Sequence, residues 1–218
     1  MKLIKFNDQI LLLEKSGAII WPEKSTAIIS DLHLEKSSFF AKNGIFIPPY
    51  DSFETLTKLR EMLINYKVKK LILLGDVFHD SKAYERLEKS SKKIFESLIK
   101  SYEIIFIFGN HDKFIKIPNM KFFNTFSEQN INFSHEPQIN KKSLICGHLH
   151  PKIILKINGK KISKKCFVYS RNIIFLPAYG RFTGGLDVRN KEFSKYLDSN
   201  TIFFPLHNNK IYKLTNNL

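Results

Sequence analysis

Two histidines, His148 and His150, lie two positions apart in the stretch LICGHLHP. Each imidazole has two ring nitrogens that need partners, so a pair of them is costly inside an apolar core. Imidazoles this close together readily share one cation or bind two neighbouring cations. We expect Gly147 to let the chain turn so that both rings reach their targets. This spacing therefore suggests metal ligands.

Polar side chains follow four further apolar runs, in the segments SDLHLEK, GDVFHD, GNHD and SHEP. These segments hold the candidates Asp31, His33, Asp76, His79, Asn110, His111, Asp112 and His135. Six of the seven histidines lie in these segments or in GHLHP, and His207 lies elsewhere. Ligands bind at the carboxyl ends of strands in α/β sheets, so the pattern predicts one shared site.

Each motif also has an ordinary interpretation. The Asp31-x-His33 pair and the GDxxH segment occur in solvated turns, His111 fits a satisfied loop histidine, and His135 fits a buried structural histidine. Gly109 is expected to permit a tight exit from its strand, with Asn110 and His111 diverging to different sides. The coincidence of five such motifs at strand ends favours the metal site.

The elements that must position these groups are visible as apolar runs. KLIKF and ILLLEK are predicted to form a hairpin, and AIIW and TAIIS to form buried strands. KKLILLGD, EIIFIFGN, INFSHEP and SLICGHLHP predict four more strands. A helix of about four turns is predicted from Asp51, with Glu54 three residues on as in a capping box. Its helical spacing involves Phe53, Leu56, Leu59, Leu63 and Tyr66.

A second amphipathic helix is indicated by Leu87, Ile94, Phe95, Leu98 and Tyr102. From about Lys152 the pattern changes to short strands with turn signals such as Asn158-Gly159. The continuous Ile, Leu and Phe runs imply strands covered on both faces, and hence a layered α/β sandwich. We expect one domain over 1–218, with a βαβ-like part at 1–150 and a hairpin-rich part at 151–218.

Composition limits the class of protein. The 218 residues, 43% of them hydrophobic, suffice for one sizeable core. No apolar stretch reaches a membrane span or a leader, so we expect a soluble protein of the cytoplasm. Cys146 and Cys166 form no CxxC pair, which argues against disulfides and cysteine-based zinc sites. The net charge of +15 favours a polyanion such as nucleic acid, although a coding bias toward lysine would also produce it.

The series D-x-H, GDxxH, GNHD, H and GHxH resembles that of the calcineurin-like metallophosphoesterases at every metal-ligand position of that superfamily. The resemblance implies a four-layer sandwich with two mixed β-sheets flanked by helices and two divalent cations at the strand ends. It implies that Asp31, His33 and His150 hold one metal. It likewise implies that Asn110, His135 and His148 hold the other, and that Asp76 bridges both.

The ligand set is chemically reasonable by itself. Imidazoles, carboxylates and one amide suit Mn²⁺, Fe or Zn²⁺ better than Ca²⁺, with Mn²⁺ the first expectation. Two such cations about 3.5–4 Å apart activate water and stabilise the attacking and leaving oxygens of an in-line displacement. His111, which is not used as a ligand, resembles the catalytic histidine of the family, and Asp112 is a candidate for orienting it.

Two longer stretches narrow the resemblance. DLHLEKSSFFAKNGIFIPPYDS and FLPAYGRFTGGLDV are similar to segments of the bacterial PdeM branch, the ligase-associated DNA damage response endonucleases. This similarity runs from the opening hairpin to about Val188, and the tail beyond carries no family signal. It implies a metal-dependent endonuclease acting on DNA, encoded beside a DNA ligase, a helicase and a nuclease in repair operons.

Candidate substrate contacts lie near these motifs: Lys36, which follows Glu35 at the cleft rim, His79, Tyr179, Arg181 and Phe182. The ring of Tyr179 and the guanidinium of Arg181 suit stacking and phosphate binding on a nucleic acid strand, and an ordinary loop with a buried aromatic is the alternative. Six lysines crowd the hairpin after GHLHP, at positions 152, 156, 160, 161, 164 and 165. They form either a solvated face or a track for phosphates.

Three functions remain open from the sequence. The first is a DNA-directed metallonuclease. The second is a phosphoesterase for a small nucleotide or lipid diphosphate, which the metal motifs permit equally. The third is a non-catalytic scaffold of the same fold, and the presence of His111 with all seven ligand positions counts against it.

Overall fold

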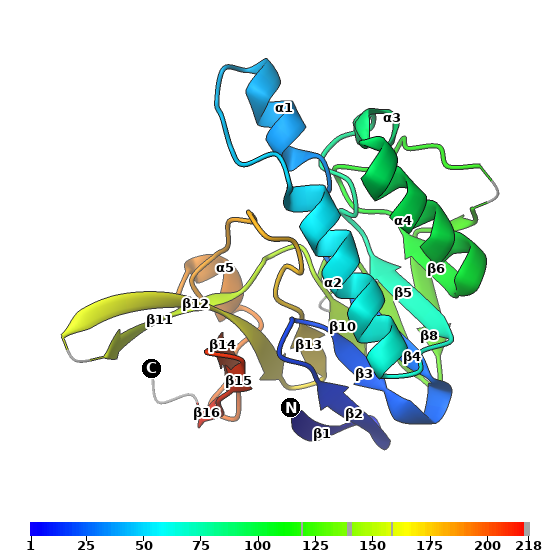
Figure 1. Ribbon diagram of the computed structural model, residues 1–218. Coiled ribbons are helices and arrows are strands. Elements are labelled where there is room, and N and C mark those ends of the chain that lie inside the picture. Colours follow the sequence, from blue (N-terminus) through cyan, green and yellow to red (C-terminus); the bar gives the residue numbers. More distant parts are fainter. Residues whose placement is uncertain (119, 139–140, 158, 216–218) are drawn as a thin grey trace.

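The computed structural model describes residues 1–118, 120–138, 141–157 and 159–215 of the chain. Two β-sheets pack against each other, and helices cover the outer face of the first sheet (Figure 1). The expected turn residue Asn158 lies outside the described residues. No helix in the described ranges is long and apolar enough to cross a membrane.

The first sheet has seven strands, antiparallel from β1 to β4 and parallel from β4 to β7. Its strands in spatial order are β1 (Lys2–Phe6), β2 (Gln9–Leu13), β3 (Ile19–Trp21), β4 (Thr26–Ile29), β5 (Lys70–Leu74), β6 (Glu103–Ile107) and β7 (Phe122–Phe123). The predicted opening hairpin and the predicted strands through β6 are confirmed. A short 3₁₀ helix, η1 (Pro22–Lys24), links β3 to β4.

Helices lie in the crossovers between the parallel strands. They are α1 (Lys36–Lys42), α2 (Asp51–Asn65), α3 (Ala83–Arg86) and α4 (Lys89–Ser101). The α2 helix begins at Asp51 as predicted, and Leu56, Leu59 and Leu63 pack into the core. Phe53 was expected on that face but is 41% exposed, because its position in the helix points outward.

The capping-box interpretation of Asp51 is wrong. Its carboxylate accepts hydrogen bonds from the backbone N–H and the hydroxyl of Ser37, at 3.2 and 2.6 Å. Asp51 therefore ties the start of α2 to the start of α1 and leaves its own helix uncapped by a side chain. Similarly, Leu87 lies outside the second predicted helix, because α4 begins at Lys89.

The second sheet has nine strands, with β10 parallel to both β9 and β13 and the other pairs antiparallel. Its strands are β8 (Thr125–Glu128), β9 (Ile131–Ser134), β10 (Leu144–Cys146), β11 (Lys152–Ile157), β12 (Lys160–Ser170), β13 (Ile173–Phe175), β14 (Ile202–His207), β15 (Lys210–Ile211) and β16 (Leu214–Thr215). The long β11–β12 hairpin extends away from the body (Figure 1). The tail after Val188 joins the sheet through β14, which pairs with β12.

Three apolar cores separate the layers. The first lies between the helices and the first sheet, and the second lies between the two sheets, where Trp21, Phe133 and Phe167 are fully buried. The third covers the outer face of the second sheet with residues of and around α5 (Lys191–Ser194), including Phe193. The predicted α/β sandwich with two mixed sheets flanked by helices is confirmed, with a thin fourth layer around α5.

Candidate metal centre

The sequence-predicted ligands converge at the carboxyl ends of five strands. Asp31 and His33 follow β4, Asp76 follows β5, and Asn110 follows β6. The second sheet contributes the remaining three: His135 directly after β9, then His148 and His150 after β10. Because both sheets point these strand ends at the same region, seven side chains meet although the first and last are more than a hundred residues apart along the chain.

One cluster combines Asp31, His33 and His150. His150 Nε2 lies 3.0 Å from Asp31 Oδ1 and 3.2 Å from His33 Nε2. Each of these three residues offers one ligand atom, and the three atoms lie close enough together to bind one metal ion. The structure therefore brings together the set that the resemblance assigns to the first metal.

A second cluster combines Asn110, His135 and His148. Asn110 Oδ1 lies 2.9 Å from His135 Nε2 and 3.2 Å from His148 Nδ1, and the two ring nitrogens are 3.1 Å apart. Asp76 lies between the clusters, with Oδ2 3.3 Å from His135 Nε2 and 3.9 Å from His33 Nε2. The carboxylate of Asp76 is thus placed to reach both groups.

The donor geometry fits metal ions. Ligands held at about 2.0–2.2 Å from one cation lie about 3.0–3.5 Å from each other, which matches the separations within both clusters. Asp31 Oδ1 is fully buried, and no donor among the described residues is aligned to give it a hydrogen bond, although His150 Nε2 is near. A buried carboxylate oxygen without such a bond is costly, and a cation would satisfy it.

The local electrostatics favour the protonation states that metal binding requires. Burial lowers the pKa of His33 to about 3, and burial together with His135 lowers the pKa of His148. Burial acts against ionisation of Asp31, but its histidine neighbours, led by His150, hold the pKa of that carboxyl well below its usual range. Neutral imidazoles and an ionised carboxylate are the ligand forms that bind metal.

His135 behaves differently in the absence of a bound ion. Burial alone would lower its pKa, but the hydrogen bond with Asp76 and the charges of Asp31 and Asp76 raise the pKa to about 9. Its Nδ1 donates to the backbone carbonyl of Leu74 at 2.8 Å, which leaves Nε2 as the atom facing Asp76 and Asn110. A cation at this place would displace the Nε2 proton, and the carbonyl fixes the tautomer needed for coordination.

The backbone at the site is strained. Five of the seven ligand candidates have left-handed φ angles: Asp31 (+57°), His33 (+47°), Asp76 (+48°), His148 (+70°) and His150 (+45°). Each such conformation costs on the order of 1–3 kcal/mol in a residue other than glycine. Strain of this kind concentrates where side chains must converge on a ligand, so it supports a functional assignment.

The glycines of the motifs act by leaving space. The chain bends directly after Gly109 and Gly147, but neither glycine adopts a left-handed φ, so conformational freedom is not what makes them necessary. A Cβ on Gly147 would overlap Ser30 Oγ and lie 2.5 Å from Asp31 Oδ2, and one on Gly109 would overlap Asp76 Oδ1. Only a residue without a side chain allows these loops to approach the carboxylates this closely.

We therefore expect Gly147→Ala to lower both Mn²⁺ content and turnover about 10–100-fold, the range seen when groups that support metal ligands are changed. Elemental analysis and a phosphodiesterase assay measure the two effects. Gly184→Ala is the matched control, because a Cβ there meets nothing within 4 Å. Full metal content and normal turnover in Gly147→Ala would contradict the close-approach argument.

His111 is exposed at the rim of the two clusters. Asp112 was the candidate for orienting it, but His79 is the residue that contacts its ring. Its Nδ1 lies 2.9 Å from the backbone carbonyl of His79, and its Nε2 lies 4.0 Å from Asp76 Oδ2. Both oxygens of Asp112 instead accept backbone N–H groups, from Gly109 at 2.7 Å and Val77 at 2.8 Å. Asp112 thus secures the loop, and the partner that orients His111 is His79.

The ring of His79 strengthens this support. It stacks on the His111 ring with centroids 5.2 Å apart, and Phe39 and Phe40 of α1 pack around it at 4.8 and 5.7 Å. His79 is 9% exposed, and burial followed by the charge of Lys36 lowers its pKa to about 4. His79, which was expected to contact the substrate, is therefore a buried residue that packs against His111. It also lies near His33, with the two Nδ1 atoms 3.4 Å apart.

The remaining substrate candidates separate into surface and core. Lys36 begins α1 next to the site, whereas Glu35 is buried and accepts a hydrogen bond from Ser52. Arg181 is exposed and forms an ion pair with Glu54, with its guanidinium 5.4 Å from the ring of Phe182. Tyr179 is only 4% exposed, so its ring is not free to stack on a base.

Ser30 is a site residue that the sequence reasoning missed. Its hydroxyl donates to Asp31 Oδ2 at 2.6 Å, and Gly147 packs against it. The signal was its position directly before the first ligand, at the end of a buried strand. His207, by contrast, lies in β14 and belongs to none of the metal-type clusters of the described residues, as expected.

Comparison with known proteins extends this picture. A model of the family described as calcineurin-like phosphoesterase matches residues 24–204. The match continues past Val188, so the family signal reaches further into the tail than the sequence motifs indicate. No curated protein matches the sequence.

Two solved structures show how far the likeness extends. The nuclease MPE from Pseudomonas putida is 23% identical, covers 98% of this chain and 99% of its own, and superposes with a TM-score of 0.76. The phosphoesterase Yfce from E. coli is 15% identical, covers 88% and 99%, and has a TM-score of 0.42. The first of these shares the overall fold described above.

Proposed function

Because this chain belongs to the calcineurin-like phosphoesterase family, we propose that it is a dinuclear-metal-dependent phosphodiester hydrolase that cleaves DNA as an endonuclease. The observation that carries the proposal is the convergence of seven ligand-type side chains into two adjoining clusters that share Asp76. The exposed imidazole of His111 beside them provides a group for proton transfer.

We assign Asp31, His33 and His150 to one divalent cation and Asn110, His135 and His148 to the other, with Asp76 reaching both. When bound, the two cations supply Lewis acidity at the phosphoryl oxygens and activation of the attacking water. Imidazole, carboxylate and amide donors favour Mn²⁺, with Fe or Zn²⁺ as alternatives.

His111 has a defined tautomer in this arrangement. The carbonyl of His79 is only an acceptor, so Nδ1 of His111 must carry the hydrogen of that 2.9 Å contact. Nε2 then carries a second proton only in the imidazolium form. We propose that this Nε2–H stabilises a phosphoryl oxygen or protonates the leaving alkoxide, while the His79 carbonyl and ring hold the imidazole in place.

A polynucleotide is the proposed substrate for two reasons, and the PdeM-like segments favour DNA. The net charge of +15 suits a polyanion, and the solved structure that shares the overall fold is named a nuclease. The PdeM-like segments add a proposed role in DNA repair, with the ligase and helicase of such operons as candidate partners. Cys146 and Cys166 are free and buried, which agrees with the reducing cytoplasm that we propose as the compartment.

We expect Mn²⁺-loaded protein to cleave DNA. Gel assays would compare single-stranded, duplex and nicked DNA with RNA, and a parallel absorbance assay would measure hydrolysis of bis-p-nitrophenyl phosphate. Cleavage of DNA should weaken steeply as salt rises, because phosphate contacts release counterions, while turnover of the small diester should respond little. A protein that hydrolyses a small nucleotide or lipid diphosphate but no polynucleotide would replace the nuclease with the small-substrate alternative. Absence of all hydrolysis would favour the scaffold.

A further inference from the structure

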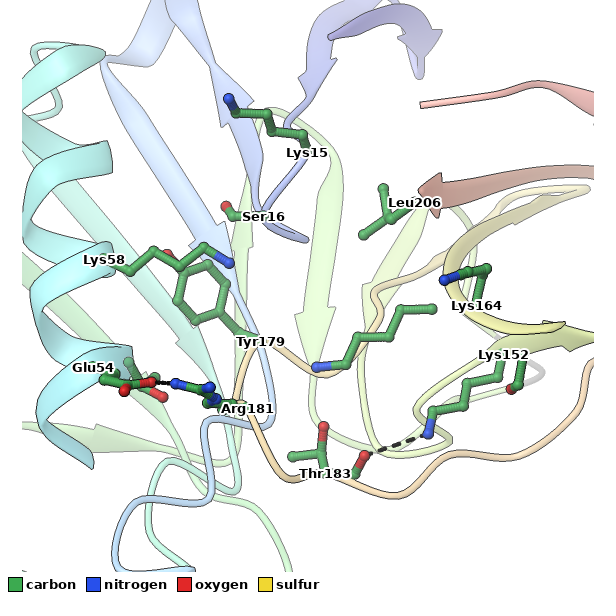
Figure 2. A pocket seen from close by; sticks show the side chains of 13 residues that line it. Lys15, Ser16, Glu54, Lys58, Lys152, Lys164, Tyr179, Arg181, Thr183 and Leu206 are labelled. Carbon is green, nitrogen blue, oxygen red and sulfur yellow. Dashed lines mark hydrogen bonds and ion pairs between the residues drawn. The ribbon is translucent and has the colours of Figure 1, made fainter. Parts of the chain in front are cut away.

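A pocket of about 570 Å³ opens beside the metal centre, where the two sheets meet. Its walls come from the loop after β2, from α2, from β11 and β12, and from the loop that follows β13 (Figure 2). Lys58 extends into it from the α2 side, and Lys152 and Lys164 extend into it from the hairpin side (Figure 2). The volume lies within the range of about 300–1,000 Å³ typical of small-ligand sites.

The lining of this pocket is strongly cationic. Its basic residues are Lys15, Lys58, Lys152, Lys164, Lys165 and Arg181. Glu54 is the one acidic residue of the lining, and it already pairs with Arg181. Within the described ranges, none of the five lysines has a carboxylate at ion-pair distance. We call this cavity, with its five lysines, the lysine pocket.

Two lysines of the pocket are held in fixed positions. Lys165 Nζ donates to the backbone carbonyls of Ala178 and Gly180 at 2.7 and 2.6 Å, and Lys152 Nζ lies 3.5 Å from the carbonyl of Thr183. Burial, together with the charges of Lys58 and Lys152, lowers the pKa of Lys165 to about 7. Gathering these ammonium groups thus costs free energy that a bound anion would offset.

The lysine pocket adjoins the residues around the metal centre. Thr55, Arg181 and Thr183 line the pocket and also pack in the closed region around His33 and Lys36. The charges of Lys36 and Lys152 also act on each other, and the charge of Asp31 acts on Lys165. These shared residues place the pocket next to the metal centre.

We propose that the lysine pocket binds backbone phosphates of the substrate strand next to the phosphodiester that is cleaved. This inference rests on the proposed function, since it requires a polynucleotide at the metal centre. A polynucleotide strand carries one charge at every nucleotide, so a single bound strand can place phosphates at the metals and in the pocket together. A diester with one phosphate reaches only the metals, which makes the pocket a determinant of substrate class.

The test compares Lys58→Gln/Lys164→Gln with the parent. Both changes replace an ammonium with a neutral amide on a side chain one atom shorter, and they remove charge from opposite walls of the pocket (Figure 2). The readouts are kcat/KM for a single-stranded oligodeoxynucleotide and for bis-p-nitrophenyl phosphate, both with Mn²⁺, and Kd for the same oligonucleotide by fluorescence anisotropy. Lys93→Gln/Lys100→Gln is the matched control, because both residues are exposed on α4, outside the pocket lining.

In the pocket variant, we expect the ratio of kcat/KM for the oligonucleotide to kcat/KM for the small diester to fall about 10-fold or more. The variant should also bind the oligonucleotide about 10-fold more weakly. The slope of log binding constant against log salt concentration should be shallower by about 0.7 per lysine removed. The control variant should match the parent. Equal kcat/KM ratios and equal Kd in parent and pocket variant would overturn the pocket but leave the proposed function standing. A parent that neither cleaves nor binds polynucleotides would overturn both, and a parent that binds without cleavage would leave Kd to decide the pocket.

Discussion

Asp76→Ala is expected to abolish stable binding of both metal ions and to lower turnover by at least about 10³-fold. Loss of one neutral hydrogen-bond donor at a reacting centre already costs about 10²–10³-fold, and Asp76 contributes a full charge placed between both ligand clusters. Elemental analysis after Mn²⁺ loading should give close to two ions in the parent and fewer than one in the variant.

Asp76→Asn separates charge from shape. Asp76 Oδ1 also accepts the backbone N–H of His111 at 2.9 Å, so alanine removes a hydrogen bond of the GNHD loop along with the ligand. Asparagine keeps an oxygen for that bond and should still show the metal and activity defects. A parent that binds no more than one ion, with no further loss in Asp76→Ala, would defeat the dinuclear proposal.

His111→Ala is expected to lower turnover about 10²–10⁴-fold, the usual range for a positioned acid or base, with metal content nearly unchanged. The seven proposed ligands do not include this exposed imidazole, whose Nδ1 lies against the His79 carbonyl and whose Nε2 is 4.0 Å from Asp76 Oδ2. His148→Ala should instead reduce metal content and turnover together, because its Nδ1 lies within the second cluster.

The leaving group distinguishes two roles for His111. If the imidazolium protonates the leaving oxygen, the defect should shrink for a p-nitrophenyl phosphodiester, because p-nitrophenolate leaves as an anion without being protonated. An equal defect with good and poor leaving groups would indicate stabilisation of the phosphoryl group. His207→Ala is the control and should stay within a few-fold of the parent, since His207 lies in β14. If His111→Ala loses metal while the remaining holoenzyme turns over normally, His111 is a ligand.

The sequence by itself determined most of the elements and identified the candidate ligands. Apolar runs located β1 to β6, β9 and β10, and helical spacing located α2 and α4, because burial on one or both faces imposes a period that local sequence records. Polar residues placed directly after those runs identified the strand ends that converge, since carboxyl ends of strands in α/β sheets meet at one edge. The order of the motifs then indicated the family, which the comparison confirms.

Only the tertiary structure decided how these residues work together. The partner of His111 is the backbone carbonyl of His79 on another loop, and Asp112 also accepts the amide of Val77 from that loop. No spacing along the chain encodes these two contacts. The space-saving role of Gly147 depends on Ser30, which the fold brings across from the other sheet.

The lysine pocket shows the same limit most plainly. The hairpin lysines stood out in the sequence, but Lys15 and Lys58 are isolated in the first half of the chain and join them only when α2 and the β11–β12 hairpin are brought together. For Tyr179 the sequence left a stacking ring and a buried aromatic equally open, and the fold buries it. Local sequence reports which side chains prefer burial and where strands end, whereas contacts between distant segments depend on how whole layers pack, and that is a property of the complete fold.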